Sequence, residues 1–91
     1  MDFEIADELG IGTNATFIGA ILSIEPSTSG SFAVVTMINT TGETLVVKVW
    51  TEQLYSKLAV RNVVKVSAYI TEYDNNNVKE KQYNVRPILL T

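Results

Sequence analysis

Short runs of alternating apolar and polar residues, rich in β-branched side chains, limit most strongly what this chain can fold into. Valine, isoleucine and threonine occupy 11, 8 and 10 of the 91 positions, and these side chains favour strands over helices. A chain of this length has room for a single hydrophobic core. We therefore expect one domain that is built mainly of β-strands.

Five strands and one short helix are expected. The strand patterns cover residues 16–24, 31–39, 43–50, 62–73 and 78–89, and the helix pattern covers residues 51–58. Thr51 is placed to cap the helix, and Leu54 and Leu58 lie on one of its faces. Gly19 indicates a bulge, a bend or a close backbone approach within its strand. Pro87 lacks an N–H and is expected on a sheet edge or at a strand end.

The order of these elements is typical of the OB fold, a five-stranded, partly open barrel with a helix between strands three and four. We expect an all-β protein with one short helix, in which residues 13–91 form the OB-fold barrel. Residues 1–12 form an acidic N-terminal segment with weak helical spacing. A small SH3-like barrel or sandwich is the alternative, against which the helix after the third strand argues.

The chain contains no cysteine and no histidine. Disulfides, thiolate or imidazole metal sites and histidine-based catalytic triads are therefore excluded. The remaining residues show no catalytic pattern, so we expect a protein that is not an enzyme and has no metal or cofactor. No apolar run approaches the roughly 20 residues of a membrane helix, and the acidic start is unlike a signal peptide. These features predict a cytoplasmic protein without a membrane partner.

The alternation along the strands also predicts a binding face. Phe32 and Thr36 on the second strand, and Lys48 and Trp50 on the third, are expected to point outward side by side. Single-stranded nucleic acid is held by aromatic rings under its bases and by cations along its phosphates. Residues expected at such a site are Phe32, Thr36, Lys48, Trp50, Lys65, Tyr69, Tyr73, Lys79 and Lys81. A core position for Phe32, and a plug at the barrel's end formed by Trp50, are the alternatives.

From Thr16 onward the sequence resembles OB domains of the anticodon-binding type and single-stranded DNA-binding proteins. It is also similar to the N-terminal OB domains of some exoribonucleases. The resemblance rests on the strand with Gly19, the hairpin Asn39–Thr44, the run to Trp50 and the segment Val60–Tyr73. Asn39 stands where an acidic residue is usual, and Arg61-Asn62 replaces the usual Gly-Asp. The resemblance implies binding of single-stranded DNA or RNA, with DNA favoured, and no catalysis by this domain.

A second hypothesis is an OB-fold module that binds proteins, either alone or as the N-terminal domain of a larger nuclease or repair protein. Its support is the net charge of −3 and the outward Val34, Ile38 and Val46, which would suit a homo-oligomer. A basic stripe from Lys48 past Lys65 to Lys81 would instead favour nucleic acid, with little sequence preference and a place in DNA replication or repair. Basic residues scattered over all faces would favour the protein partner.

Removal of residues 1–10 is predicted to strengthen binding to single strands at low salt. This segment holds Asp2, Glu4, Asp7 and Glu8 and no basic residue, so it would repel phosphates if it lies near the binding face. The measurement is the affinity of the full and truncated chains for one oligonucleotide at low and high salt. Equal affinities would show that the segment lies elsewhere or is screened.

Overall fold

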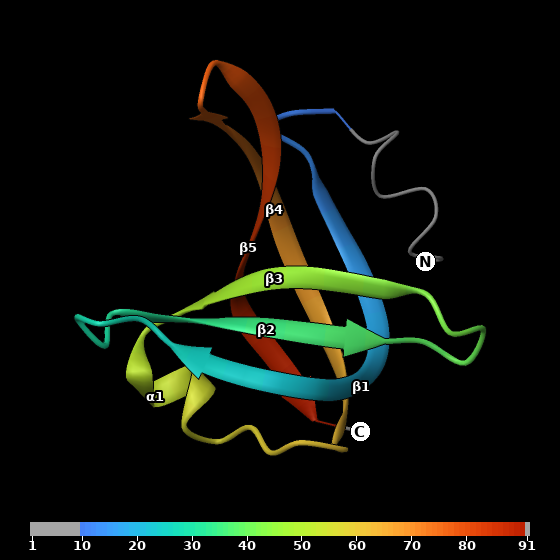
Figure 1. Cartoon of the computed structure of the whole chain (residues 1–91). Coiled ribbons are helices and arrows are strands. Elements are labelled where there is room, and N and C mark those ends of the chain that lie inside the picture. Colours follow the sequence, from blue (N-terminus) through green and yellow to red (C-terminus); the bar gives the residue numbers. More distant parts are fainter. Residues whose placement is uncertain (1–9, 91) are drawn as a thin grey trace.

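The computed structural model of the protein describes residues 10–90, and it describes side chains as far as residue 85. This part of the chain forms five strands and one short helix in the predicted order (Figure 1). The elements are β1 (Asn14–Pro26), β2 (Phe32–Ile38), β3 (Thr44–Trp50), α1 (Glu52–Tyr55), β4 (Val63–Asn75) and β5 (Val78–Leu90). The helical spacing noted in residues 1–9 lies outside the described residues.

The strands close into a barrel in the order β1-β2-β3-β5-β4, and β1 makes the closure possible. Its first half pairs antiparallel with β4, from Asn14 opposite Tyr69 onward, and its second half pairs antiparallel with β2. Figure 1 shows β1 curving from the side of β4 to the side of β2. A short parallel contact between β3 and β5 completes the ring. The predicted five-stranded OB-fold barrel is confirmed.

β1 contains a β-bulge close to the point where it changes its partner from β4 to β2. The pairing register shifts between Ile21 and Ser23, which leaves Leu22 as the extra residue. Gly19, which the sequence indicated as a bulge, bend or close approach, pairs regularly with Val64. A bulge adds one residue to one strand and increases its twist. The bulge therefore lies three positions beyond the glycine, and Ala20, next to Gly19, is where β1 changes its partner from β4 to β2.

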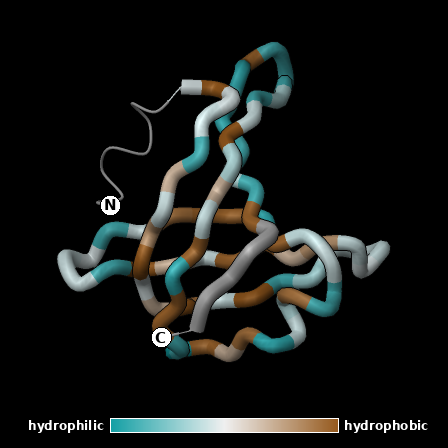
Figure 2. Tube along the Cα trace, turned by 180° about the vertical axis from the view of Figure 1, so that it is seen from behind, coloured by the Kyte–Doolittle hydropathy of each residue, from teal (hydrophilic) through white to brown (hydrophobic). Residues whose placement is uncertain are grey.

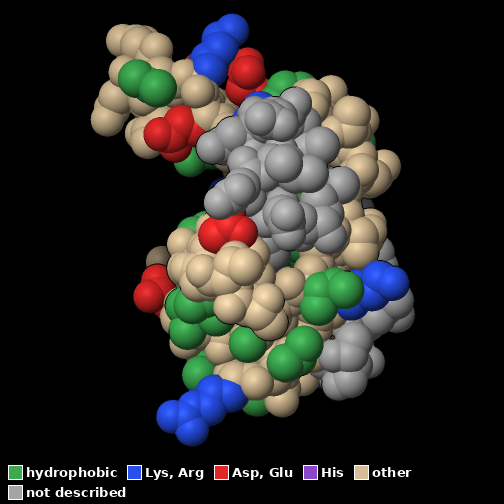
Figure 3. Space-filling view, turned by 90° about the vertical axis from the view of Figure 1, so that its right-hand side faces the viewer, with side chains coloured by type: hydrophobic (Ala, Val, Ile, Leu, Met, Phe, Trp, Pro, Cys, Tyr) green, Lys and Arg blue, Asp and Glu red, His purple; other side chains and the backbone are tan. Residues whose placement is uncertain are grey.

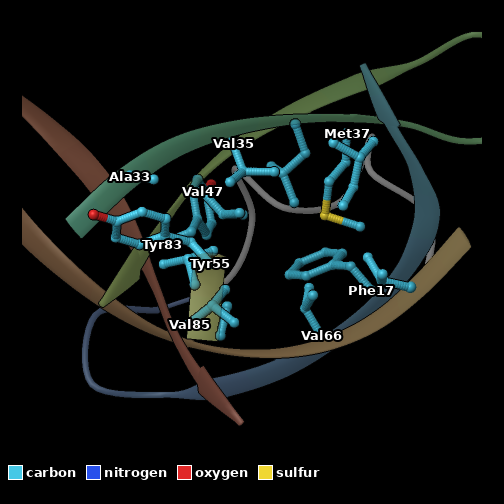
Figure 4. Packing of buried hydrophobic residues seen from close by; sticks show 14 of the residues in the cluster. Phe17, Ala33, Val35, Met37, Val47, Tyr55, Val66, Tyr83 and Val85 are labelled. Atoms are coloured by element: carbon cyan, nitrogen blue, oxygen red, sulfur yellow. The ribbon is translucent and has the colours of Figure 1, made fainter. Parts of the chain in front are cut away.

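The core is formed by the inward-facing residues of all five strands. Figure 2 shows hydrophobic and hydrophilic positions alternating along much of the chain. The inward sets expected in the second, third and fourth strands are all buried: Ala33, Val35, Met37, Leu45, Val47, Val49, Val64, Val66, Ala68 and Ile70. Phe17 lies near Met37 and Val66 (Figure 4), and its ring meets Tyr83 edge-on at 6.3 Å between centroids. The period-two pattern therefore predicts the core correctly.

Helix α1 is shorter than predicted, and Thr51 stands at its N-cap position without the expected side-chain hydrogen bond. Only Glu52–Tyr55 are helical, and Thr51 makes no side-chain capping bond. Its backbone N–H donates to the carbonyl of Ser31 at 2.9 Å, which ties Thr51 to the β1–β2 loop. Leu54 and Leu58 pack against the core from the helix side as expected, and the buried Tyr55 joins the core itself.

Several strand ends also differ from the expectation. Residues 25 and 26, predicted as loop, extend β1 because they pair with Val34 and Ala33. The turn predicted at residues 74–77 shrinks to Asn76 and Asn77, whose φ values are +53° and +68°. Two consecutive positive φ values suit a tight two-residue hairpin turn. β4 and β5 consequently pair as far as Asn75 and Val78.

Pro87 lies within β5, in the part of the strand that pairs with β4 alone, because the pairs between β3 and β5 end at Val85. This is the sheet-edge position that the sequence predicted. The pairing of β4 with β5 is irregular here: Val66 pairs with Ile88, whereas Ala68 pairs with Val85. Pro87 falls inside this irregularity, where a residue without an N–H is tolerated.

No helix within residues 10–90 is long and apolar enough to cross a membrane.

Replacement of Thr51 by glycine is predicted to stabilise the fold. Thr51 has φ +77° and ψ +133°, a conformation that strains a β-branched residue and suits glycine. Relief of about 1–3 kcal/mol of strain should exceed the entropic cost of glycine, for a net gain of about 1 kcal/mol in the free energy of unfolding. Urea denaturation measures this gain.

The matched control is Ser56→Gly, because Ser56 has ordinary helical angles of φ −67° and ψ −18°. This substitution should lower the free energy of unfolding by about 0.5–1 kcal/mol. If Thr51→Gly destabilises the protein as much as Ser56→Gly does, Thr51 is not strained.

Candidate nucleic-acid interface

An aromatic pair lies at one end of the β2–β3 hairpin. Phe32 begins β2 and Trp50 ends β3, and the two residues are opposite each other in the register. Their ring centroids are 4.9 Å apart, with the planes inclined at 45°. Both side chains are half-buried, and neither belongs to the buried core cluster. The pair therefore lies on the outer face of the barrel.

The ammonium group of Lys48 is held at the centre of this region. Its Nζ lies 4.7 Å from the ring centroid of Phe32 and 6.0 Å from that of Tyr73. It also donates a hydrogen bond of 3.1 Å to Oε1 of Gln82. Cation–π contacts and a hydrogen bond together limit where the charge can move. We call Phe32, Lys48, Trp50 and Tyr73 the aromatic cluster.

Asn84 fixes the indole of Trp50. Nε1 of Trp50 donates to Oδ1 of Asn84 at 2.9 Å, and Nε2 of Gln82 donates to the same oxygen at 2.6 Å. Nδ2 of Asn84 in turn donates to the backbone carbonyl of Tyr69 and to Oγ1 of Thr71, both at 3.0 Å. The orientation of Trp50 is thus set from β4 and β5.

Gln82 and Asn84 are site residues that the sequence prediction missed. A signal was available, because both alternate with Tyr83 and Val85, whose shared inward position the sequence indicated and the structure confirms. Nothing in the sequence, however, indicated that β5 lies beside β3. Without that pairing, the amides cannot be linked to Lys48 and Trp50.

A row of directly paired residues crosses the barrel at this level. Asn14 is opposite Tyr69, Tyr69 opposite Asn84, Asn84 opposite Lys48, and Lys48 opposite Val34.

Grooves lie on either side of the β3–β5 contact. The first, about 630 Å³, is the polar groove, lined by Asn14, Trp50, Ser67, Tyr69, Thr71, Gln82 and Asn84. The second, about 340 Å³, is the lysine groove, lined by Val34, Val46, Val47, Lys48, Tyr73, Lys81, Gln82 and Tyr83.

Tyr69 and Tyr73 are the exposed aromatic residues near these grooves, at 47% and 42% exposure. The hydroxyl of Tyr73 donates to Oε2 of Glu80 at 2.7 Å, directly across the β4–β5 hairpin. This hydrogen bond, which holds the phenol in its protonated form, raises the pKa of Tyr73. The ring of Tyr73 is thereby held beside Lys48.

Other residues predicted for the site lie outside both grooves. Lys79 forms an ion pair with Glu72 at 3.8 Å on the outer part of the β4–β5 hairpin. Lys65 is four residues from Tyr69 along β4 and pairs with Ile18 on β1. Thr36 is half-buried and pairs with Val46. The structure thus gathers Phe32, Lys48, Trp50, Tyr69, Tyr73 and Lys81 at the two grooves, but not Thr36, Lys65 and Lys79.

The basic residues whose side chains are described do not form the continuous stripe that would favour nucleic acid most strongly. On the face shown in Figure 3, the Lys and Arg side chains lie apart from one another. Among the side chains described, only Lys48 and Lys81 line one groove together. Within the same part of the chain, no three Asp, Glu, His or Cys side chains are grouped to hold a metal ion.

No protein-family model matches the sequence, and no curated protein matches it. Solved structures match its fold. The mitochondrial single-stranded DNA binding protein of S. cerevisiae is 15% identical, with a TM-score of 0.66 over 86% of this chain and 94% of that chain. The second OB-fold domain of replication protein A from Methanococcus maripaludis is 15% identical, with a TM-score of 0.64 over 93% and 90%.

A replication protein A heterotrimer bound to single-stranded DNA also matches, at 16% identity and a TM-score of 0.64, over 93% of this chain and 62% of that chain. At these identities the similarity concerns the fold. The chain is an OB-fold domain similar to those of single-stranded DNA-binding proteins, as its sequence predicted.

The pKa of Tyr73 is predicted to fall in the variant Glu80→Gln. Because the folded-state pKa is raised above the ordinary value of 10.0, the stability from this contact is complete below pH 10.0 and is lost as the pH rises through the raised value. The titration of tyrosinate absorbance, with Tyr73→Phe subtracted, follows this group alone. A pKa that is unchanged in Glu80→Gln would show that the hydrogen bond is not maintained in solution.

Proposed function

We propose that this domain binds single-stranded nucleic acid, with DNA favoured over RNA and little sequence preference along the strand. The observation that carries the proposal is the aromatic cluster, in which a held lysine lies between rings on an outer face of the barrel. Rings that stack on bases and cations that meet phosphates are the two parts of a single-strand site. The fold shared with the single-stranded DNA-binding proteins named above supports the same conclusion.

The residues of this site have different roles in the proposal. Trp50, Tyr69 and Tyr73 provide the ring surfaces on which bases stack. Phe32 instead supports the site, because its ring is already in contact with Trp50 and Lys48. Lys48 and Lys81, which line the lysine groove, meet the phosphates.

The modest number of cations sets the expected dependence on salt. Each phosphate contact to a single strand contributes about 0.7 to the slope of log affinity against log salt, so two lysines give about 1.4. This slope is small for a nucleic-acid site, and stacking, which salt does not screen, supplies the larger share of the affinity. We propose that the domain acts in a DNA replication or repair assembly. We propose no catalytic step for it.

A protein-binding module is the second candidate, favoured by exposed apolar side chains. Val46 is 53% exposed on β3, whereas Val34 and Ile38, which were expected to face outward with it, are half-buried. Ile18 and Val63 are also exposed, beside a groove on the β1–β4 side. Val34 and Val46 line the lysine groove beside Lys48 and Tyr73, whereas Ile18 and Val63 line a groove that contains no residue of the aromatic cluster. Substitutions of Ile18 and Val63 therefore test the protein-binding candidate separately from the nucleic-acid site.

Substitutions of Trp50 and Lys48 should weaken binding with different dependences on salt. Trp50→Ala should cost roughly 1–3 kcal/mol of binding free energy at every salt concentration, because it removes a stacking surface. The binding free energy lost in Lys48→Ala should decrease as the salt concentration rises. This variant should also lower the slope of log affinity against log salt by about 0.7. Anisotropy of a labelled oligothymidine at several salt concentrations measures both effects. In the wild-type protein, binding should also quench Trp50, the single tryptophan.

Two control variants separate binding from folding. Lys57→Ala removes an exposed lysine next to α1 and should leave affinity and salt slope unchanged. Trp50→Phe keeps an aromatic ring and should retain more affinity than Trp50→Ala. A large loss of melting temperature in Trp50→Ala would make its binding defect structural. Native melting with unchanged binding in both Trp50→Ala and Lys48→Ala would contradict the proposal and favour the protein-binding module.

A further inference from the structure

The two grooves beside the β3–β5 contact differ in charge. The lysine groove contains Lys48 and Lys81, whereas the lining of the polar groove includes no charged residue. Phosphates are bound by cations, and base edges are bound by neutral donors and acceptors. The polar groove therefore has the chemistry of a site for a base, not for the strand's backbone.

Some polar groups of this groove are already engaged by the protein. Asn84 uses its oxygen to accept from Trp50 and Gln82, and its nitrogen to donate to β4. Gln82 accepts from Lys48 and donates to Asn84. These two amides position the ring and the ammonium group, so they are not the groups that meet a ligand.

Asn14 and Ser67 are different, because neither side chain forms a hydrogen bond with another described residue. Asn14 is exposed and Ser67 is half-buried. An asparagine amide offers both donors and an acceptor, and a serine hydroxyl offers one donor and an acceptor. Both groups are available to a ligand in the groove.

The register brings these two groups to the aromatic rings. Asn14 is opposite Tyr69 across β1 and β4, and Ser67 precedes Tyr69 by two residues on the same outer face. Trp50 reaches the groove from β3 and is fixed there by Asn84. A volume of about 630 Å³ is ample for a nucleobase. Ring surfaces and unpaired polar groups thus line one cavity.

We propose that the polar groove is a base-recognition pocket, in which one base stacks on Trp50 or Tyr69 and forms hydrogen bonds with Asn14 and Ser67. The inference rests on the proposed function and refines it. The site recognises the identity of one base in the bound strand and binds the neighbouring bases whatever their identity. The four bases present different orders of donors and acceptors. Two polar groups whose backbone positions are set by the pairing of β1 with β4 therefore favour one base over the others.

The test compares labelled oligonucleotides of dT, dC and dA with equal length, by fluorescence anisotropy with the full chain. Wild-type affinities should differ by at least about fivefold between the preferred and the poorest base, the lower end of the effect of one good base contact. In the double variant Asn14→Ala, Ser67→Ala, the affinity for the preferred oligonucleotide should fall and the three values should converge. Circular dichroism melting verifies that the double variant is folded.

Matched variants assign the effect to the polar groove. Lys48→Ala should weaken binding of all three oligonucleotides by one common factor, so the ratios of their affinities stay unchanged. It should also lower the slope of log affinity against log salt. Asn75→Ala, which removes an exposed amide near the tip of the β4–β5 hairpin, should change neither affinity nor ratio.

The outcomes separate this inference from the proposed function. Equal wild-type affinities for all three oligonucleotides would overturn base recognition and leave general single-strand binding intact. A base ratio that persists in a folded Asn14→Ala, Ser67→Ala double variant would overturn the assignment to this groove. No binding to any oligonucleotide would overturn both proposals together.

Discussion

The parallel contact between β3 and β5 is the interaction on which the candidate site depends. It consists of two residue pairs, Lys48 with Asn84 and Val49 with Val85. The second pair points into the core and the first points outward, so closure of the barrel and assembly of the site happen in one place. Through Asn84, this contact connects the indole of Trp50 to strands that come much later in the sequence.

A small acidic protein can present a nucleic-acid site if its few cations are held in place. The chain carries a net charge of −3, so long-range attraction to phosphates is weak. Lys48 is confined by two rings and the Gln82 amide, and a confined side chain loses less entropy when it meets a ligand. Together with ring surfaces, this arrangement relies on short-range contacts more than on the overall electric field.

The errors of the sequence prediction share a cause. The period-two pattern assigned the inner and outer faces of β2, β3 and β4 correctly, because that choice depends on the strand alone. The side-chain cap expected at Thr51 is absent, and the bulge lies beyond Gly19 rather than at it, because each feature depends on a neighbouring strand or loop. Thr51 is tied to Ser31, and the bulge lies at Leu22, near the point where β1 changes its partner from β4 to β2.

The sequence by itself determined the number and order of the strands, the core residues of β2, β3 and β4, and the outward direction of Phe32, Lys48 and Trp50. These features follow from local alternation and turn chemistry, which act over a few neighbouring residues. Only the tertiary structure decided that Asn84 fixes Trp50, that Tyr73 lies beside Lys48, and that Lys65 and Lys79 lie outside the grooves. The physical reason is that register and closure bring together residues distant in the chain, and no local pattern specifies those distances.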